Sequence, residues 1–144
     1  MDKINSTLSI EQRELLDLHL RYVIEENKTT NLTRITDWET AKILHVEDSL
    51  VGVPFIEKAP QGDYLDMGTG AGFPGIPIAI TTERKTLLAD SVGKKITALN
   101  RMITKLSLEG IVSTFQGRIE DLAKDQPENF SVITARALSS LSSL

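Results

Sequence analysis

The sequence predicts an α/β fold in which a helical segment precedes a parallel β-sheet. Two patterns carry this prediction. Before residue 61 the apolar residues recur at helical spacing, whereas from residue 61 onward short apolar stretches alternate with helical ones. A glycine-rich turn, residues 68–75, joins the first apolar stretch to the helical pattern after it. We therefore expect residues 1–60 to form an N-terminal helical extension and residues 61–144 to form a sheet domain.

The composition indicates one ordinary globular domain. Of the 144 residues, 40% are hydrophobic, 25% are charged and none is cysteine. These values are typical of a folded soluble chain and exclude disulfides and thiolate metal sites. No apolar run approaches the ~20 residues that span a bilayer, and the N-terminus lacks a signal-peptide pattern. We therefore expect a cytoplasmic protein with no membrane partner.

Two helices are expected in the extension. Residues Ser9–Gln12 match a capping box that opens the first helix, which has an apolar stripe along one face. Asp37 has the position and the side chain of an N-cap for a second helix that runs toward Leu50. Pro54 and the turn at residues 60–62 are expected to separate these helices from the sheet domain.

Four strands are expected in the sheet domain, at residues 64–67, 86–90, 112–115 and 131–135. The second strand is followed by an amphipathic helix over residues 93–108, and Gly110 is expected to end that helix. Because strands alternate with helices, we expect a parallel sheet with right-handed crossovers.

The glycine-rich turn fits two cofactor classes. Gly70–Gly75 matches G-x-G-x-x-G, and Asp90 follows 20 residues after Gly70, as in dinucleotide-binding proteins. However, the strand is expected to end at Met67, so the turn is longer than one that presses a helix N-terminus against a pyrophosphate. This length weakens the dinucleotide interpretation.

Counted from Asp66, the same turn reads D-x-G-x-G-x-G, the pattern of S-adenosylmethionine-dependent methyltransferases. Glycine amides and a nearby carboxylate suit the charged groups of the methionyl part, and Asp90 is placed to accept hydrogen bonds from the ribose hydroxyls. We favour this interpretation. A dinucleotide site of the NAD type and a turn without a ligand are the alternatives that the residues leave open.

Residues 66–77, which end in Phe-Pro-Gly-Ile-Pro, resemble the signature of the RsmG (GidB, glucose-inhibited division protein B) family. Five further motifs occur in the family's order, at residues 31–33, 45–50, 90–95, 118–120 and 136–141. This family methylates a guanine N7 in the 530 loop of 16S ribosomal RNA. The resemblance implies a Rossmann-like class I methyltransferase fold, S-adenosylmethionine as cofactor, and 16S ribosomal RNA or the small ribosomal subunit as partner.

The methyltransferase pattern and the resemblance together imply a set of cofactor contacts. These are Asp66, Gly68, Gly70, Phe73, Asp90, Ile119, Glu120 and Arg136. In the family, Ile119 and Glu120 would lie along the adenine ring. From the residues alone, Glu120 is also explained as an acid in the first turn of a helix, and Arg136 as a solvent-facing residue at a strand end.

Charge is unevenly distributed along the chain. The net charge is −4, but between residues 84 and 118 the basic residues outnumber the acidic ones. Such a stretch either faces an RNA backbone or forms a solvated helix face. With RNA as the partner, we assign Lys94, Lys95 and Arg118 to its phosphates.

The two histidines are not expected to be catalytic. His45 and Asp48 have the three-residue spacing of a surface histidine that is satisfied by an acid on the same helix face. His19 carries no functional signal, and two histidines without thiols give no metal site. Guanine N7 presents a lone pair on the major-groove edge. Methyl transfer to it therefore needs no general base, and we assign no catalytic residue.

The chain is short for the family that it resembles. The methyltransferase sheet usually has seven strands, whereas four are expected here, in the order 3-2-1-4. We expect a truncated member whose fourth strand is an open edge, whose sheet faces lack covering helices, and whose activity is weak or absent. Two further hypotheses are self-association through that edge and a non-catalytic remnant that binds RNA or protein.

Overall fold

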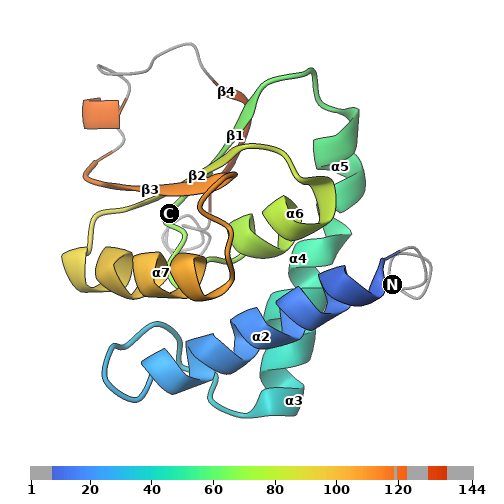
Figure 1. Cartoon of the computed structure of the whole chain (residues 1–144). Helices are drawn as coiled ribbons and strands as arrows, with labels where there is room; N and C mark the ends of the chain where they lie inside the picture. Colours follow the sequence, from blue (N-terminus) through green and yellow to red (C-terminus); the bar gives the residue numbers. More distant parts are fainter. Residues whose placement is uncertain (1–7, 119, 123–129, 136–144) are drawn as a thin grey trace, which may run out of the picture.

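The computed structural model describes residues 8–118, 120–122 and 130–135, and it confirms the α/β class (Figure 1). Four parallel strands form one sheet in the order β3-β2-β1-β4. Their bounds are Asp63–Met67 for β1, Thr86–Asp90 for β2, Val112–Gln116 for β3 and Phe130–Ala135 for β4. The predicted strand order is confirmed, and each end of every strand agrees with its prediction to within one residue.

The crossovers place a crevice at one edge of the sheet. Helix α6, Gly75–Thr82, connects β1 to β2, and helix α7, Gly93–Lys105, connects β2 to β3. The chain then returns past β1, so that the strand order reverses between β1 and β4. In open parallel sheets, ligands bind outside the carboxyl ends of the strands at such a reversal.

Helix α7 ends earlier than predicted, and Gly110 does not end it. The C-cap is Leu106, and Ser107 takes the left-handed conformation (φ 57°) that we expected of Gly110. The N–H groups of Ser107 and Leu108 donate to carbonyls one turn earlier and close the helix end. The prediction for Gly110 was wrong because a serine adopts the strained backbone position, while the glycine lies in the next turn.

The extension is helical, as predicted, but it contains more helices than expected. Helix α2, Ile10–Glu26, begins with the predicted capping box at Ser9 and Gln12. After the predicted N-cap Asp37 come α3 (Trp38–Ala41), the π-helix η1 (Lys42–Glu47), α4 (Asp48–Val51) and α5 (Val53–Lys58). Pro54 lies in the first turn of α5, where no backbone N–H is needed. It therefore begins a helix and does not separate the extension from the sheet.

One hydrophobic core runs across both parts of the chain. It joins the apolar face of α2 to the apolar side chains of α6 and α7, and these helices lie on the same side of the sheet (Figure 1). On the other face the described residues form a smaller cluster around Leu65, and Ile133 of β4 is 53% exposed. The expectation of uncovered sheet faces is thus wrong for the helical side. The domain division at residue 60 stays a prediction.

Arg84 ties the end of α5 to the amino edge of the sheet. Its guanidinium donates five hydrogen bonds of 2.7–3.2 Å, to the carbonyls of Ile56, Ala59, Pro60 and Gly62 and to Ser131 Oγ. A single side chain therefore satisfies the carbonyls at the end of a helix and holds β4 beside the start of β1.

Replacing Arg84 by alanine is expected to lower the free energy of unfolding by about 2–3 kcal/mol, because hydrogen bonds from a charged donor are each worth roughly 1.5–3 kcal/mol and water replaces part of them. Urea unfolding measures this loss. Lys85→Ala, at the exposed neighbouring residue, is the control and should change stability by less than about 0.5 kcal/mol. An Arg84→Ala midpoint equal to that of the control would contradict the role described here.

Candidate cofactor site

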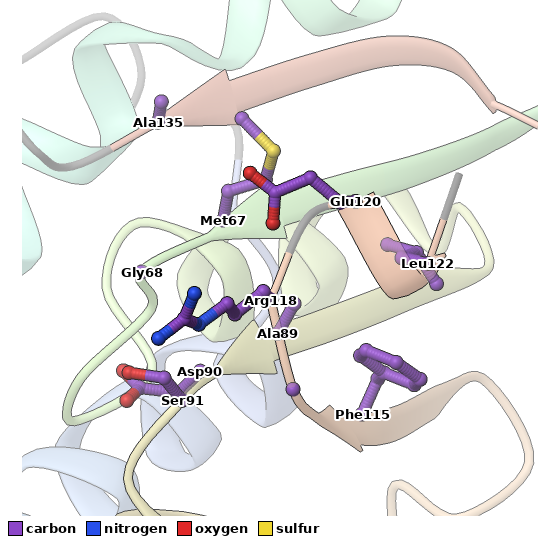
Figure 2. Close-up of a pocket in the computed structure, with 11 residues that line it drawn as sticks. Met67, Gly68, Ala89, Asp90, Ser91, Phe115, Arg118, Glu120, Leu122 and Ala135 are labelled. Atoms are coloured by element: carbon purple, nitrogen blue, oxygen red, sulfur yellow. The ribbon is translucent and has the colours of Figure 1, made fainter. Parts of the chain in front are cut away.

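A cavity of about 370 Å³ opens at the carboxyl ends of the strands (Figure 2). All four strands or the residues directly after them contribute to its wall, through Met67, Gly68, Ala89, Asp90, Phe115 and Ala135. The segment after β3 completes the wall with Gly117, Arg118 and Glu120. The cavity therefore occupies the crevice that the reversal of strand order creates.

The carboxylate of Asp66 supports the glycine-rich turn by accepting hydrogen bonds from it. It is fully buried, and its Oδ2 accepts hydrogen bonds from the Thr69 hydroxyl at 2.7 Å and from the Gly75 N–H at 3.0 Å. Its Oδ1 accepts from the Thr134 hydroxyl at 2.9 Å. The carboxyl group thus joins both ends of the turn to each other and to β4. Asp66 does not line the cavity, so its predicted cofactor contact stays a prediction, while its support of the turn is observed.

Asp90 connects the turn to the end of β2. Its Oδ2 accepts from the Gly70 N–H and its Oδ1 from the Val92 N–H, both at 3.0 Å. The side chain lines the cavity, and each carboxylate oxygen keeps acceptor capacity for another donor. Gly68, at φ 67°, also lines the cavity, and a Cβ added to it would meet no atom within 4 Å. A carboxylate and open space therefore lie side by side, as a ribose requires.

The opposite wall of the cavity is apolar, and its rim is charged. Phe115 and Leu122 supply apolar surface that suits a flat heterocycle. Figure 2 shows the Arg118 guanidinium directed toward Asp90 at the mouth of the cavity. Glu120 is exposed and lines the same cavity. The adenine contact of Glu120 and the RNA contact of Arg118 stay predictions.

Two of the predicted site residues, Ile119 and Arg136, lie outside the described residues. Phe73 is described, but it is not part of the cavity wall. Its side chain is fully buried, and its ring centroid lies 4.6 Å from those of both His19 and His45. The side chain therefore packs the turn against the helical extension, and a cofactor contact by Phe73 stays a prediction.

Both histidines contact the glycine-rich turn through the ring of Phe73, which residue spacing did not predict. His19 is fully buried, its Nε2–H donates to the Ala71 carbonyl at 2.9 Å, and its Nδ1 has no hydrogen-bond partner among the described residues. His45 is buried, with its Nε2 2.9 Å from Thr33 Oγ1. The interpretation of His45 as a surface residue satisfied by Asp48 was wrong. The wider turn of π-helix η1 no longer places residues three apart on one face.

Burial lowers the pKa of His19 to about 4; the hydrogen bond to Ala71 opposes this shift and His45 adds to it. The unfolded chain therefore takes up this proton near pH 6.5 and the folded chain only near pH 4. Stability that is complete above pH 6.5 should fall by about 3 kcal/mol as the pH is lowered to 4. Urea unfolding of the wild type and His19→Gln across this range checks the expectation. The wild type should lose more stability than the variant, and parallel losses would contradict it.

The structure divides the basic residues of the 84–118 stretch into two groups. Arg84 binds the carbonyls described above, and Arg101 makes a bidentate ion pair with Glu26 at 2.7 and 2.9 Å. Lys94 and Lys95 lie in the first turn of α7, where Lys94 is exposed and Lys95 half-buried. Two of the basic residues in this stretch, Arg84 and Arg101, thus make contacts within the fold. The RNA contacts of Lys94 and Lys95 stay predictions.

Within residues 8–118, 120–122 and 130–135, no three histidine, aspartate or glutamate side chains gather closely enough to hold a metal ion. In the same part of the chain, no helix has both the length and the apolar character needed to cross a membrane.

Comparison with known proteins identifies relatives along nearly the whole chain. The family profile GidB, described as rRNA small subunit methyltransferase G, matches residues 12–144. A ribosomal RNA small subunit methyltransferase G from Lachnoclostridium phytofermentans is 39% identical over 140 residues, covering 95% of this chain and 57% of the relative. The protein of the same name from Lactobacillus acidophilus is 38% identical, covering 100% of this chain and 62% of the relative. The chain thus spans about three fifths of the length of these relatives.

Among solved structures, the fold is similar to that of a Klebsiella pneumoniae protein described as an O-methyltransferase. The TM-score is 0.58 at 17% sequence identity, and the match covers 80% of this chain and 51% of the other. At that identity the likeness bears on the fold alone, and it agrees with a Rossmann-like methyltransferase fold.

Proposed function

From the fact that this chain belongs to the GidB family, rRNA small subunit methyltransferase G, we propose that it binds S-adenosylmethionine and takes part in methylating 16S ribosomal RNA. The acceptor that we propose is a guanine N7 in the 530 loop, as the family resemblance implies. The observation that carries the proposal is the cavity at the strand ends, with the Asp90 carboxylate on one side and an apolar wall on the other.

The described residues fit this cofactor better than a dinucleotide. Asp90 retains acceptor capacity for ribose hydroxyls, Gly68 leaves space beside it, and Phe115 offers an apolar surface for adenine. A dinucleotide places its pyrophosphate on the amides at a helix N-terminus. At the start of α6, however, the Gly75 N–H is already bound by Asp66. These contacts favour a ligand without phosphates.

When bound, S-adenosylmethionine supplies an electrophilic methyl group on a sulfonium. Transfer of this methyl group to the lone pair of guanine N7 would leave the bonding electron pair on the sulfur and would remove no proton from the base. The chain therefore has to hold the two partners in line and does not need a general base. Orientation of this kind contributes about 7–11 kcal/mol to rate enhancement in favourable cases. Asp66 serves it by fixing both ends of the turn.

Transfer of a labelled methyl group from S-adenosylmethionine tests the proposal, with 16S ribosomal RNA and the small ribosomal subunit as separate acceptors taken from cells that lack the modification. We expect label in a single guanine of the 530 loop, in the alkali-labile form that N7 methylation produces. Absence of label from both acceptors would refute methylation by this chain. Label at another base would refute the proposed target.

A further inference from the structure

A second cavity, of about 360 Å³, lies next to the cofactor cavity. The two cavities share Ala135, the last residue of β4. The rest of the second cavity's wall comes from Thr134 of β4 and from α4, α5, α6 and residues next to these helices, among them Asp48, Phe55 and Ile78. A group that fills this cavity would therefore lie beside a ligand in the first one, at the edge of the sheet.

Asp48 gives the second cavity an exposed carboxylate. It begins α4 and is exposed, and its side chain has no hydrogen bond or ion pair with another described residue. A carboxylate in such a position accepts hydrogen bonds from two neighbouring N–H donors on a planar ligand.

Phe55 gives the same cavity an exposed aromatic ring. It is 74% exposed, the largest exposure among the large hydrophobic residues described. Aromatic rings on which single bases stack are a recurring feature of proteins that bind unpaired nucleotides, and such stacking is worth about 1–3 kcal/mol per base. An exposed carboxylate and an exposed ring thus line one cavity.

We propose that this second cavity holds the unstacked target guanine, stacked on Phe55, with its N1–H and its N2 amino group donating to Asp48. N7 lies on the edge of guanine away from these two donors, and in the proposed pose it faces Ala135, the residue that the two cavities share. Adenine has an acceptor at N1 and no amino group on C2, so the same carboxylate discriminates against it. The inference rests on the proposed function and assigns the site of its acceptor.

An RNA carrying either guanine or inosine at the target position tests this contact, because inosine keeps N7 and N1–H but lacks the N2 amino group. For the wild type, inosine should lower kcat/KM by about 10-fold or more, the discrimination expected of a paired base-edge contact. Asp48→Ala should lose a similar factor on guanine and show no difference between the two RNAs. Phe55→Ala should lose activity on both RNAs, and Phe55→Tyr should restore it. Glu57→Ala, an exposed carboxylate outside the cavity, should behave like the wild type.

A binding measurement separates failure of this inference from failure of the proposed function. Guanosine and inosine monophosphates are titrated into the labelled chain with S-adenosylhomocysteine present, and amide shifts are followed by NMR. Guanosine monophosphate should shift Phe55, Ile78 and Thr134 and bind more tightly than inosine monophosphate, and Asp48→Ala should abolish that difference. This result would support the base site even if no methyl transfer occurred. Equal binding of both nucleotides, shifts elsewhere, or no binding at millimolar concentration would overturn the inference.

Discussion

Replacing Asp90 by alanine is expected to weaken S-adenosylmethionine binding by about 100-fold or more, since two hydrogen bonds to a charged acceptor, each worth roughly 1.5–3 kcal/mol, are lost together. The variant also frees the Gly70 N–H, which the Asp90 carboxylate holds at 3.0 Å. The turn therefore loses one of its links to β2 as well as its ribose acceptor, while the backbone hydrogen bonds from Gly68 and Thr69 to Ala89 remain. Isothermal titration calorimetry measures the dissociation constant.

Two variants show whether this loss belongs to the site. Asp90→Asn keeps one acceptor oxygen and should fall between the wild type and Asp90→Ala. Asp63→Ala removes a carboxyl group at the other end of β1, outside the cavity, and should bind the cofactor as the wild type does. Equal affinity of Asp90→Ala and Asp63→Ala would show that Asp90 does not contact the cofactor.

The second large effect is expected at Gly75. A Cβ at this position would overlap Leu88 Cδ2 and lie 2.8 Å from Asp66 Oδ2. Both neighbours are fully buried, and Asp66 is held by hydrogen bonds, so neither can move away easily. Gly75→Ala should therefore lower the free energy of unfolding by about 3 kcal/mol or more, through overpacking and loss of the Gly75 hydrogen bond.

Thermal or urea unfolding measures the Gly75→Ala effect, and Gly110→Ala is its matched control. Gly110 is exposed, and a Cβ there would meet no atom within 4 Å. The free energy of unfolding of Gly110→Ala should stay within about 0.5 kcal/mol of the wild-type value. A Gly75→Ala protein as stable as Gly110→Ala would mean that α6 can shift away from β2, and that the close approach at Gly75 is not required.

The sheet could be predicted because each of its strands has a signal within its own short stretch of sequence. Each strand is a short apolar stretch bounded by turn residues, and right-handed crossovers leave few possible orders for four parallel strands. The positions of Gly68 and Asp90 follow from this order, since both lie directly at strand ends. The cavity around them was therefore indicated by the sequence, although their contacts with a cofactor stay predictions.

The contacts between the extension and the turn were not predictable in this way. His19 and Ala71 are 52 residues apart, and no spacing rule connects them. The signal at His45 was misleading, because the sequence pattern gives no sign of the π-helix that turns it inward. In the sequence, Arg84 looks like an ordinary surface cation. Only the structure shows that it donates to the carbonyls at the end of α5. Each of these roles depends on packing between elements that are distant in the sequence.

Calorimetric titration of the wild-type chain with S-adenosylmethionine, with NADH as the reference ligand, tests most directly whether the cavity beside Asp90 is a cofactor site. We expect one S-adenosylmethionine to bind per chain and NADH not to bind. Absence of S-adenosylmethionine binding at millimolar concentration, or preferential binding of NADH, would contradict the assignment.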